Sequence, residues 1–156
     1  MLVQLGQPDR AVQVLQEFVQ RNPDNIEVRV QLGDLLLQAG RVDLAAPQFE
    51  VALRNAPDHA GAQLGYAWIL FQNGDVGAAR RRFESLFRTR NLTPALFGAG
   101  MCQIEQQQFG EAERTFEEVL RRQPDYWQAL GNLAGLYEQT GRLDEARRMY
   151  SRLLQF

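Results

Sequence analysis

The residue types that most often do chemistry in proteins are scarce in this chain of 156 residues. It holds one cysteine, Cys102, and one histidine, His59. A nucleophile needs a base beside it, and that base is most often histidine. Cys102 lies beside Met101 in a helical pattern, which favours a small buried or half-buried side chain over a nucleophile. His59 follows Pro57-Asp58, which is typical of an exposed histidine in a turn.

Acidic and glycine-rich motifs do not supply a site either. The pairs Glu111/Glu113 and Glu117/Glu118 alternate with arginines at helical spacing, as on a solvated helix face. Gly98-Ala99-Gly100 does not follow a strand pattern, so its glycines predict close helix packing and not a phosphate loop. One cysteine and one histidine are too few for a Cys/His metal site. The sequence therefore predicts no enzyme activity, no catalytic residue, no metal and no cofactor.

The charged residues exclude some classes of partner. All 17 cationic residues are arginine, against 19 acidic residues, and the net charge of −2 gives no bulk reason to expect a polyanion or membrane surface. The stretch 60–92 holds five arginines and two acids, but acidic stretches flank it, so we expect a solvated helix face and no nucleic acid. The longest wholly apolar stretch, 67–71, is too short to span a membrane. With 45% hydrophobic residues, a folded domain is expected.

An alanine that recurs about every 34 residues sets the organisation of the chain. Ala11, Ala45, Ala79, Ala112 and Ala146 are separated by 34, 34, 33 and 34 residues. A large apolar residue follows each alanine by four positions, and in most units a glycine precedes it by five and a proline follows it by twelve. We call each set of equivalent positions a column. The apolar column is Leu15, Phe49, Phe83, Phe116 and Tyr150. The glycine column is Gly6, Gly40, Gly74 and Gly141, with Gln107 as the exception, and the proline column is Pro23, Pro57 and Pro124, with Asn91 as the exception. Columns that share one period indicate an internal repeat.

Each unit has the pattern of two helices. Residues 26–39 place apolar side chains on one broad helical face, and Gly40 is expected to end that helix because glycine accepts the left-handed conformation. Asp43 is expected to cap the next helix. Pro57 and Asp58 then end the second helix. In the unit where Gln107 replaces glycine, the turn between the helices is less certain.

This pattern resembles the tetratricopeptide repeat (TPR) family over essentially the whole chain. The closest agreement lies in the last unit, through Trp127, Leu130, Leu133, Ala134, Tyr137, Gly141, Ala146 and Tyr150. The resemblance implies an all-α fold, a right-handed superhelical solenoid of antiparallel helix pairs with a concave groove and about four and a half repeats. We expect a single array over 1–156, with a partial repeat and four repeats at 1–25, 26–59, 60–92, 93–126 and 127–156.

The resemblance also implies that the first helix of each pair lines the concave surface. Stacking the repeats by their period brings apolar and aromatic residues of the two middle units together, with polar residues at the edge. The predicted partner-binding groove comprises Leu64, Trp68, Phe71, Phe97, Met101, Ile104, Asp34, Gln38, Gln72 and Asn132. Gly61, Gly65 and Gly98 are expected to keep the neighbouring surface shallow. We expect the groove to take a helix or peptide segment of another protein; the alternative is that several of these side chains are inter-helix core.

One use of TPR domains is not expected. The domains that hold the acidic tail of cytosolic chaperones use Lys, Arg and Asn on the concave helices, where this chain has no lysine and only the sparse Arg29 and Asn132.

The last helix lacks a polar cap, so Met149, Leu153 and Phe156 are expected to offer apolar surface for self-association or a further repeat. We expect the chain to be a piece of a larger scaffold or assembly protein, a structural spacer or oligomerisation segment, or a regulatory arm of a larger enzyme; the alternative is a self-sufficient short array. Its composition looks bacterial, and its compartment is not determined.

Overall fold

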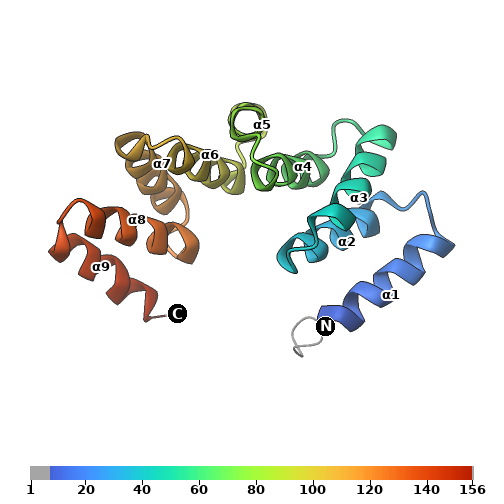
Figure 1. Ribbon diagram of the computed structural model, residues 1–156, viewed down its shortest axis with the longest axis horizontal. Helices are drawn as coiled ribbons and strands as arrows, with labels where there is room; N and C mark the ends of the chain where they lie inside the picture. The colour runs from blue at the N-terminus through green and yellow to red at the C-terminus, as the bar shows by residue number, and fades with distance from the viewer. Residues whose placement is uncertain (1–7, 156) are drawn as a thin grey trace. The chain divides into compact units, whose positions relative to one another are not determined.

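A computed structural model describes residues 8–155, which form nine α-helices and no strand (Figure 1). The expected all-α fold of helix pairs is confirmed. Gly6 of the glycine column, the residues before Pro8 in the partial repeat, and Phe156 of the predicted end surface lie outside this range. The helices are α1 (Pro8–Arg21), α2 (Ile26–Gln38), α3 (Val42–Asn55), α4 (Ala60–Gln72), α5 (Val76–Arg90), α6 (Thr93–Glu105), α7 (Phe109–Arg122), α8 (Trp127–Gln139) and α9 (Leu143–Leu153).

The chain divides into two compact units, unit 1 within Met1–Ala78 and unit 2 within Ala79–Phe156. Unit 1 holds α1 to α4 and the first residues of α5, and unit 2 holds the rest of α5 and α6 to α9. In each unit consecutive helices pack side by side, as α2 does with α3 and α8 with α9. The single array over 1–156 stays a prediction.

Tight turns join the two helices of a repeat. Gly40, Gly74 and Gly141 have φ values of 70°, 86° and 75°, in the left-handed region that glycine adopts without a steric cost. Each turn is closed by two backbone hydrogen bonds; the N–H of Gly40, for example, donates to the Leu37 carbonyl at 2.9 Å. Gln107, the exception in the glycine column, has a φ of 59° and makes the same bond to Ile104 at 2.9 Å. The turn that the sequence left uncertain therefore has the same conformation as the others.

Gln107→Gly is expected to raise the free energy of unfolding by about 0.5–1 kcal/mol, because a side chain in the left-handed region is strained by about 1–2 kcal/mol and glycine recovers most of it. Gln139→Gly, at the last residue of α8, is the matched control and is expected to be destabilising. Thermal unfolding followed by circular dichroism measures both changes. A loss of stability in both variants would contradict the assigned strain at Gln107.

Phenylalanines of the second helices pack against glycines of the first helices. In unit 1, a Cβ built on Gly33 of α2 or on Gly65 of α4 would lie 2.7 Å and 2.2 Å from the ring of Phe49. In unit 2, a Cβ on Gly98 would lie 2.5 Å from the Phe83 ring, and one on Gly100 2.6 Å from the Phe116 ring. All three rings are fully buried. Gly65 and Gly98 thus make room for buried rings of the core, and their predicted role in keeping a groove shallow stays a prediction.

The N-terminus of α3 also differs from the expectation. The helix begins at Val42, with Arg41 as its N-cap, and no side chain makes the capping hydrogen bond. Asp43, the expected cap, lies in the first turn. A carboxylate in that position still interacts favourably with the positive end of the helix dipole.

Candidate functional site

Cys102 is buried as the sequence predicts. Its side chain is fully enclosed in α6, and burial raises the pKa of the thiol to about 12. A thiol with such a pKa stays protonated at neutral pH, and the thiolate is the nucleophilic form. Cys102 thus acts as a small apolar side chain of the unit 2 core.

His59 has a structural role that the sequence did not indicate. Its ring is half-buried, Nδ1 accepts a hydrogen bond from the Ala62 N–H at 3.1 Å, and Nε2 lies 2.9 Å from Glu27 Oε1. Since Nδ1 accepts, the proton is on Nε2, which donates to the carboxylate. His59 therefore caps the N-terminus of α4 and ties it to α2, and the expectation of an exposed turn histidine is wrong.

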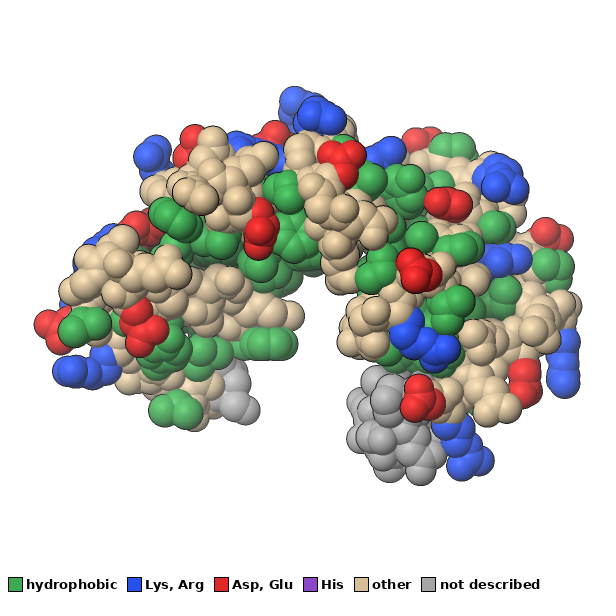
Figure 2. Space-filling view, in the orientation of Figure 1, with side chains coloured by type: hydrophobic (Ala, Val, Ile, Leu, Met, Phe, Trp, Pro, Cys, Tyr) green, Lys and Arg blue, Asp and Glu red, His purple; other side chains and the backbone are tan. Residues whose placement is uncertain are grey.

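Some arginines of unit 2 connect helices through acidic or aromatic side chains, among them Arg80, Arg122 and Arg142. Arg80 Nη2 lies 3.1 Å from Glu111 Oε2, and Arg142 Nη1 lies 2.7 Å from Glu113 Oε1. The guanidinium of Arg142 also lies 4.3 Å from the centre of the Tyr137 ring. Figure 2 shows further basic side chains standing out over α5. The pairing favours a solvated, cross-linked helix surface, as the helical spacing predicted.

No cluster of three or more His, Cys, Asp or Glu side chains within residues 8–155 is placed to hold a metal ion. None of the helices described combines the length and apolarity that a membrane crossing needs.

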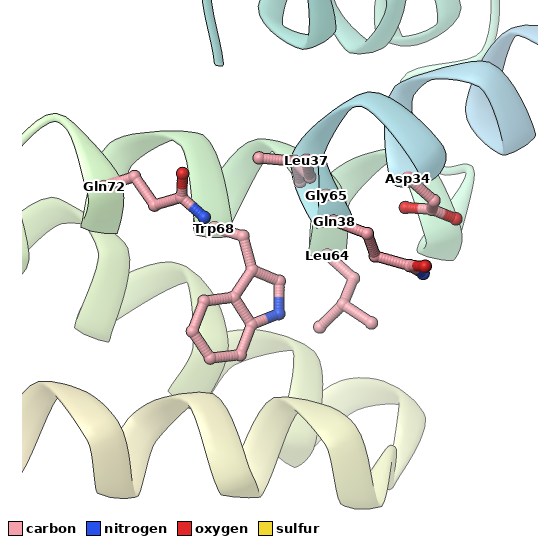
Figure 3. Close-up of a pocket in the computed structure, with 7 residues that line it drawn as sticks. All are labelled: Asp34, Leu37, Gln38, Leu64, Gly65, Trp68 and Gln72. Carbon is pink, nitrogen blue, oxygen red and sulfur yellow. The ribbon is translucent and has the colours of Figure 1, made fainter. Parts of the chain in front are cut away.

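A pocket of about 330 Å³ lies between α2 and α4 in unit 1, and five of the ten predicted groove residues line it. Trp68 and Leu64 project from α4 and are half-buried, and Asp34 and Gln38 project from α2 and are exposed (Figure 3). The complete lining is Asp34, Leu37, Gln38, Leu64, Gly65, Trp68 and Gln72. We call this site the unit 1 pocket.

Phe71 does not line the unit 1 pocket, but its ring contacts that of Trp68. Its ring centre is 5.5 Å from that of Trp68, with the ring planes at 83°. Edge-to-face pairs of this kind are favourable beyond the area that they bury. Phe71 is half-buried and fixes the orientation of the Trp68 indole.

The predicted groove residues of unit 2 are placed differently. Phe97 is 7% exposed, and its ring centre lies 5.6 Å from that of Phe116 and 5.1 Å from that of Tyr126. For Phe97 the structure thus agrees with the alternative of inter-helix core. Met101 and Ile104 are half-buried on α6.

A second pocket of about 350 Å³ lies in unit 2, over α8. It is lined by Phe97, Trp127, Gln128, Gly131, Asn132 and Leu153. Asn132 is half-buried, and its Nδ2 donates to the Gln128 carbonyl at 2.8 Å. Trp127, 61% exposed at the first residue of α8, was not among the predicted groove residues. The signal that could have found it was its large apolar side chain at an exposed helix start.

Asp34 is the carboxylate of the unit 1 pocket. Within residues 8–155 it makes no hydrogen bond or ion pair, and part of the side chain is open to water. Removal of part of its hydration shell by the pocket walls raises its pKa to about 6, and the electrostatic interaction with the nearby His59 partly offsets this effect.

The raised pKa of Asp34 predicts a pH-dependent loss of stability. Because the folded state binds the Asp34 proton more tightly than the unfolded state, this contribution is full below about pH 4 and is lost as the pH rises through about 6. Asparagine does not ionise, so Asp34→Asn avoids the loss of stability that ionised Asp34 causes. The melting temperature of Asp34→Asn at neutral pH is therefore expected to be about 1–3 °C higher than that of the wild type, a small effect because the group still contacts water. Melting curves of the wild type and Asp34→Asn across this range measure the difference, which should shrink towards acid pH. A difference that is constant with pH contradicts the shift.

Known proteins match this chain both in sequence and in structure. Two family models described as tetratricopeptide repeat match, one at residues 2–57 and 30–91 and the other at 103–156. Similar solved structures include a thermophilic TPR protein from Thermus thermophilus (TM-score 0.85, 22% identity, covering 99% of this chain and 85% of that chain). PilF from Pseudomonas aeruginosa (0.76, 17%, 98% and 70%) and MamA from Desulfovibrio magneticus RS-1 (0.71, 16%, 98% and 87%) are also similar. A search of curated proteins found no significant match.

Proposed function

Because this chain belongs to the tetratricopeptide repeat family, we propose that it binds a helix or peptide segment of another protein on the first helices of its repeats. Repeat proteins of this kind act as protein-interaction modules whose stacked units present extended binding surfaces. The observation that carries the finer proposal is the unit 1 pocket, where half-buried apolar side chains meet exposed polar ones.

The composition of the unit 1 pocket suits an amphipathic segment. Trp68 and Leu64 keep part of their apolar surface in water, and a partner's apolar side chain would cover it. Gln38 and Gln72 place amide groups at the edge, where they can donate to and accept from a peptide backbone. A central apolar contact with a polar rim is the arrangement that protein interfaces share.

Trp68→Ala tests this proposal. Peptides are first selected on the immobilised wild type from a displayed library of random short peptides, and their affinities are then measured by fluorescence anisotropy. Trp68→Ala is expected to weaken binding by about tenfold or more, because buried tryptophans carry a large share of interface energy. Phe18→Ala is the matched control, since Phe18 is 43% exposed on α1 and does not line the unit 1 pocket.

Equal affinities for the wild type and Trp68→Ala would contradict the proposal. Circular dichroism of each variant verifies that the helices are retained. Phe97 is left unchanged in this test because truncating its buried ring would cost about 3–5 kcal/mol of stability.

A second candidate function, self-association, is favoured by the outer face of α9. Leu143 is 61% exposed, Tyr150 39% and Leu154 89%, and they line one pocket of about 400 Å³ in unit 2. Exposed apolar patches of this kind often mark interaction sites. Light scattering over a wide range of concentration tests the idea, and Leu143→Glu with Leu154→Glu should abolish any dimer. A monomer at every concentration would contradict it.

A further inference from the structure

The charges of this protein are divided between the two kinds of helix. The first helices of the repeats, α2, α4, α6 and α8, carry five charged residues, of which four are acidic. They are Glu27, Asp34, Glu105, Glu138 and Arg29. All other arginines lie on second helices or in turns. A surface with this sign attracts partners of positive charge and disfavours acidic ones.

In unit 1 the other charged groups of the first helices are already engaged. Glu27 pairs with His59 at 2.9 Å. Arg29 Nε donates to the Pro23 carbonyl at 2.8 Å, and its Nη1 donates to Gln48 Oε1 at 3.2 Å. Asp34 makes no hydrogen bond or ion pair among residues 8–155, and it lines a pocket that removes part of its water. A carboxylate that has lost water gains most from a charged hydrogen-bond donor.

The unit 1 pocket places this carboxylate beside an apolar contact. Asp34 and Gln38 are one helical turn apart on α2, and Leu64 and Trp68 are one turn apart on α4 (Figure 3). We propose that the unit 1 pocket selects partner segments in which a lysine or arginine lies next to a large apolar residue. The cation pairs with Asp34, and the apolar side chain covers Leu64 and Trp68. The inference rests on the proposed function, because it specifies the chemistry of the segment bound there.

The selected peptides provide the test, with changes on both sides of the contact. They are expected to be enriched in lysine or arginine next to an apolar residue. Asp34→Asn should weaken their binding by about tenfold, the loss of one charge-assisted pair. Glu50→Gln is the matched control, since Glu50 is an exposed acid of α3 and is not a pocket residue. When the peptide's cation is made neutral, with citrulline for arginine or norleucine for lysine, Asp34→Asn should have no further effect.

The outcomes separate this inference from the proposed function. Peptides that lack cations, or that lose equal affinity to Asp34→Asn and Glu50→Gln, would overturn the inference. If those peptides still depend on Trp68, the proposed function stands. A selection that gives no peptide sensitive to Trp68→Ala overturns both. Coupling between Asp34 and the peptide cation, absent for Glu50, supports the inference.

Discussion

Gly65→Ala is expected to lower the free energy of unfolding by about 3 kcal/mol or more, although alanine is the better helix former. The added Cβ would lie 2.2 Å from Cε1 and 2.3 Å from Cζ of Phe49. That ring is fully buried and also packs against Gly33 of α2, where a Cβ would be 2.7 Å from it. The ring therefore has no free space to move into, and α2, α3 and α4 would have to separate. Urea unfolding followed by circular dichroism measures the loss.

Gly135→Ala is the matched control for this prediction. Gly135 lies inside α8, and nothing approaches within 4 Å of a Cβ built there. The substitution is expected to raise the free energy of unfolding by about 0.5–1 kcal/mol, since it removes the conformational entropy cost of glycine in a helix. Opposite signs at the two glycines would establish ring packing as the cause; a stabilising Gly65→Ala would contradict it.

Phe49→Ala is expected to lower the free energy of unfolding by about 3–5 kcal/mol, the cost of removing a fully buried ring and leaving a cavity. Tyr150→Ala, at the equivalent position four residues after the repeat alanine, is expected to cost about 1 kcal/mol. The Tyr150 side chain is 39% exposed, and its hydroxyl donates to Glu138 Oε2 at 2.9 Å. The same column of the repeat thus holds a core residue in unit 1 and a surface residue in α9.

Protein concentration provides the control for this pair. If Tyr150→Ala costs as much as Phe49→Ala, the outer face of α9 is covered in solution. That cover would come from a second copy if the melting temperature of the wild type rose with concentration. A melting temperature independent of concentration, with a small effect of Tyr150→Ala, agrees with the exposed face.

Local signals explain why the helix pairs could be predicted from the sequence. First helices begin at Ile26, Ala60, Thr93 and Trp127, and these positions follow from the period of the alanine column. Glycine and proline act on the backbone within a few residues, so their spacing determines where helices end whatever packs around them. Gln107 shows the limit of this argument: the turn keeps its left-handed conformation without glycine, because both adjoining helices fix it.

The candidate site was predictable in part. The period correctly placed Asp34, Gln38, Leu64, Trp68 and Gln72 on neighbouring first helices, and the structure joins them in one pocket. Their role in binding, together with that of Phe71, Met101 and Ile104, stays a prediction. The single array and the bacterial origin also stay predictions.

By itself, then, the sequence determined the family, the helix pairs and the face on which each apolar side chain lies, because these depend on periodicity along one chain segment. Tertiary structure alone decided which of those side chains is core. Leu64 and Phe97 share one column of the repeat, yet Leu64 is half-buried in a pocket and Phe97 is packed against Phe116 and Tyr126. Burial depends on the volume of neighbours that are distant in sequence, and helical spacing carries no information about them.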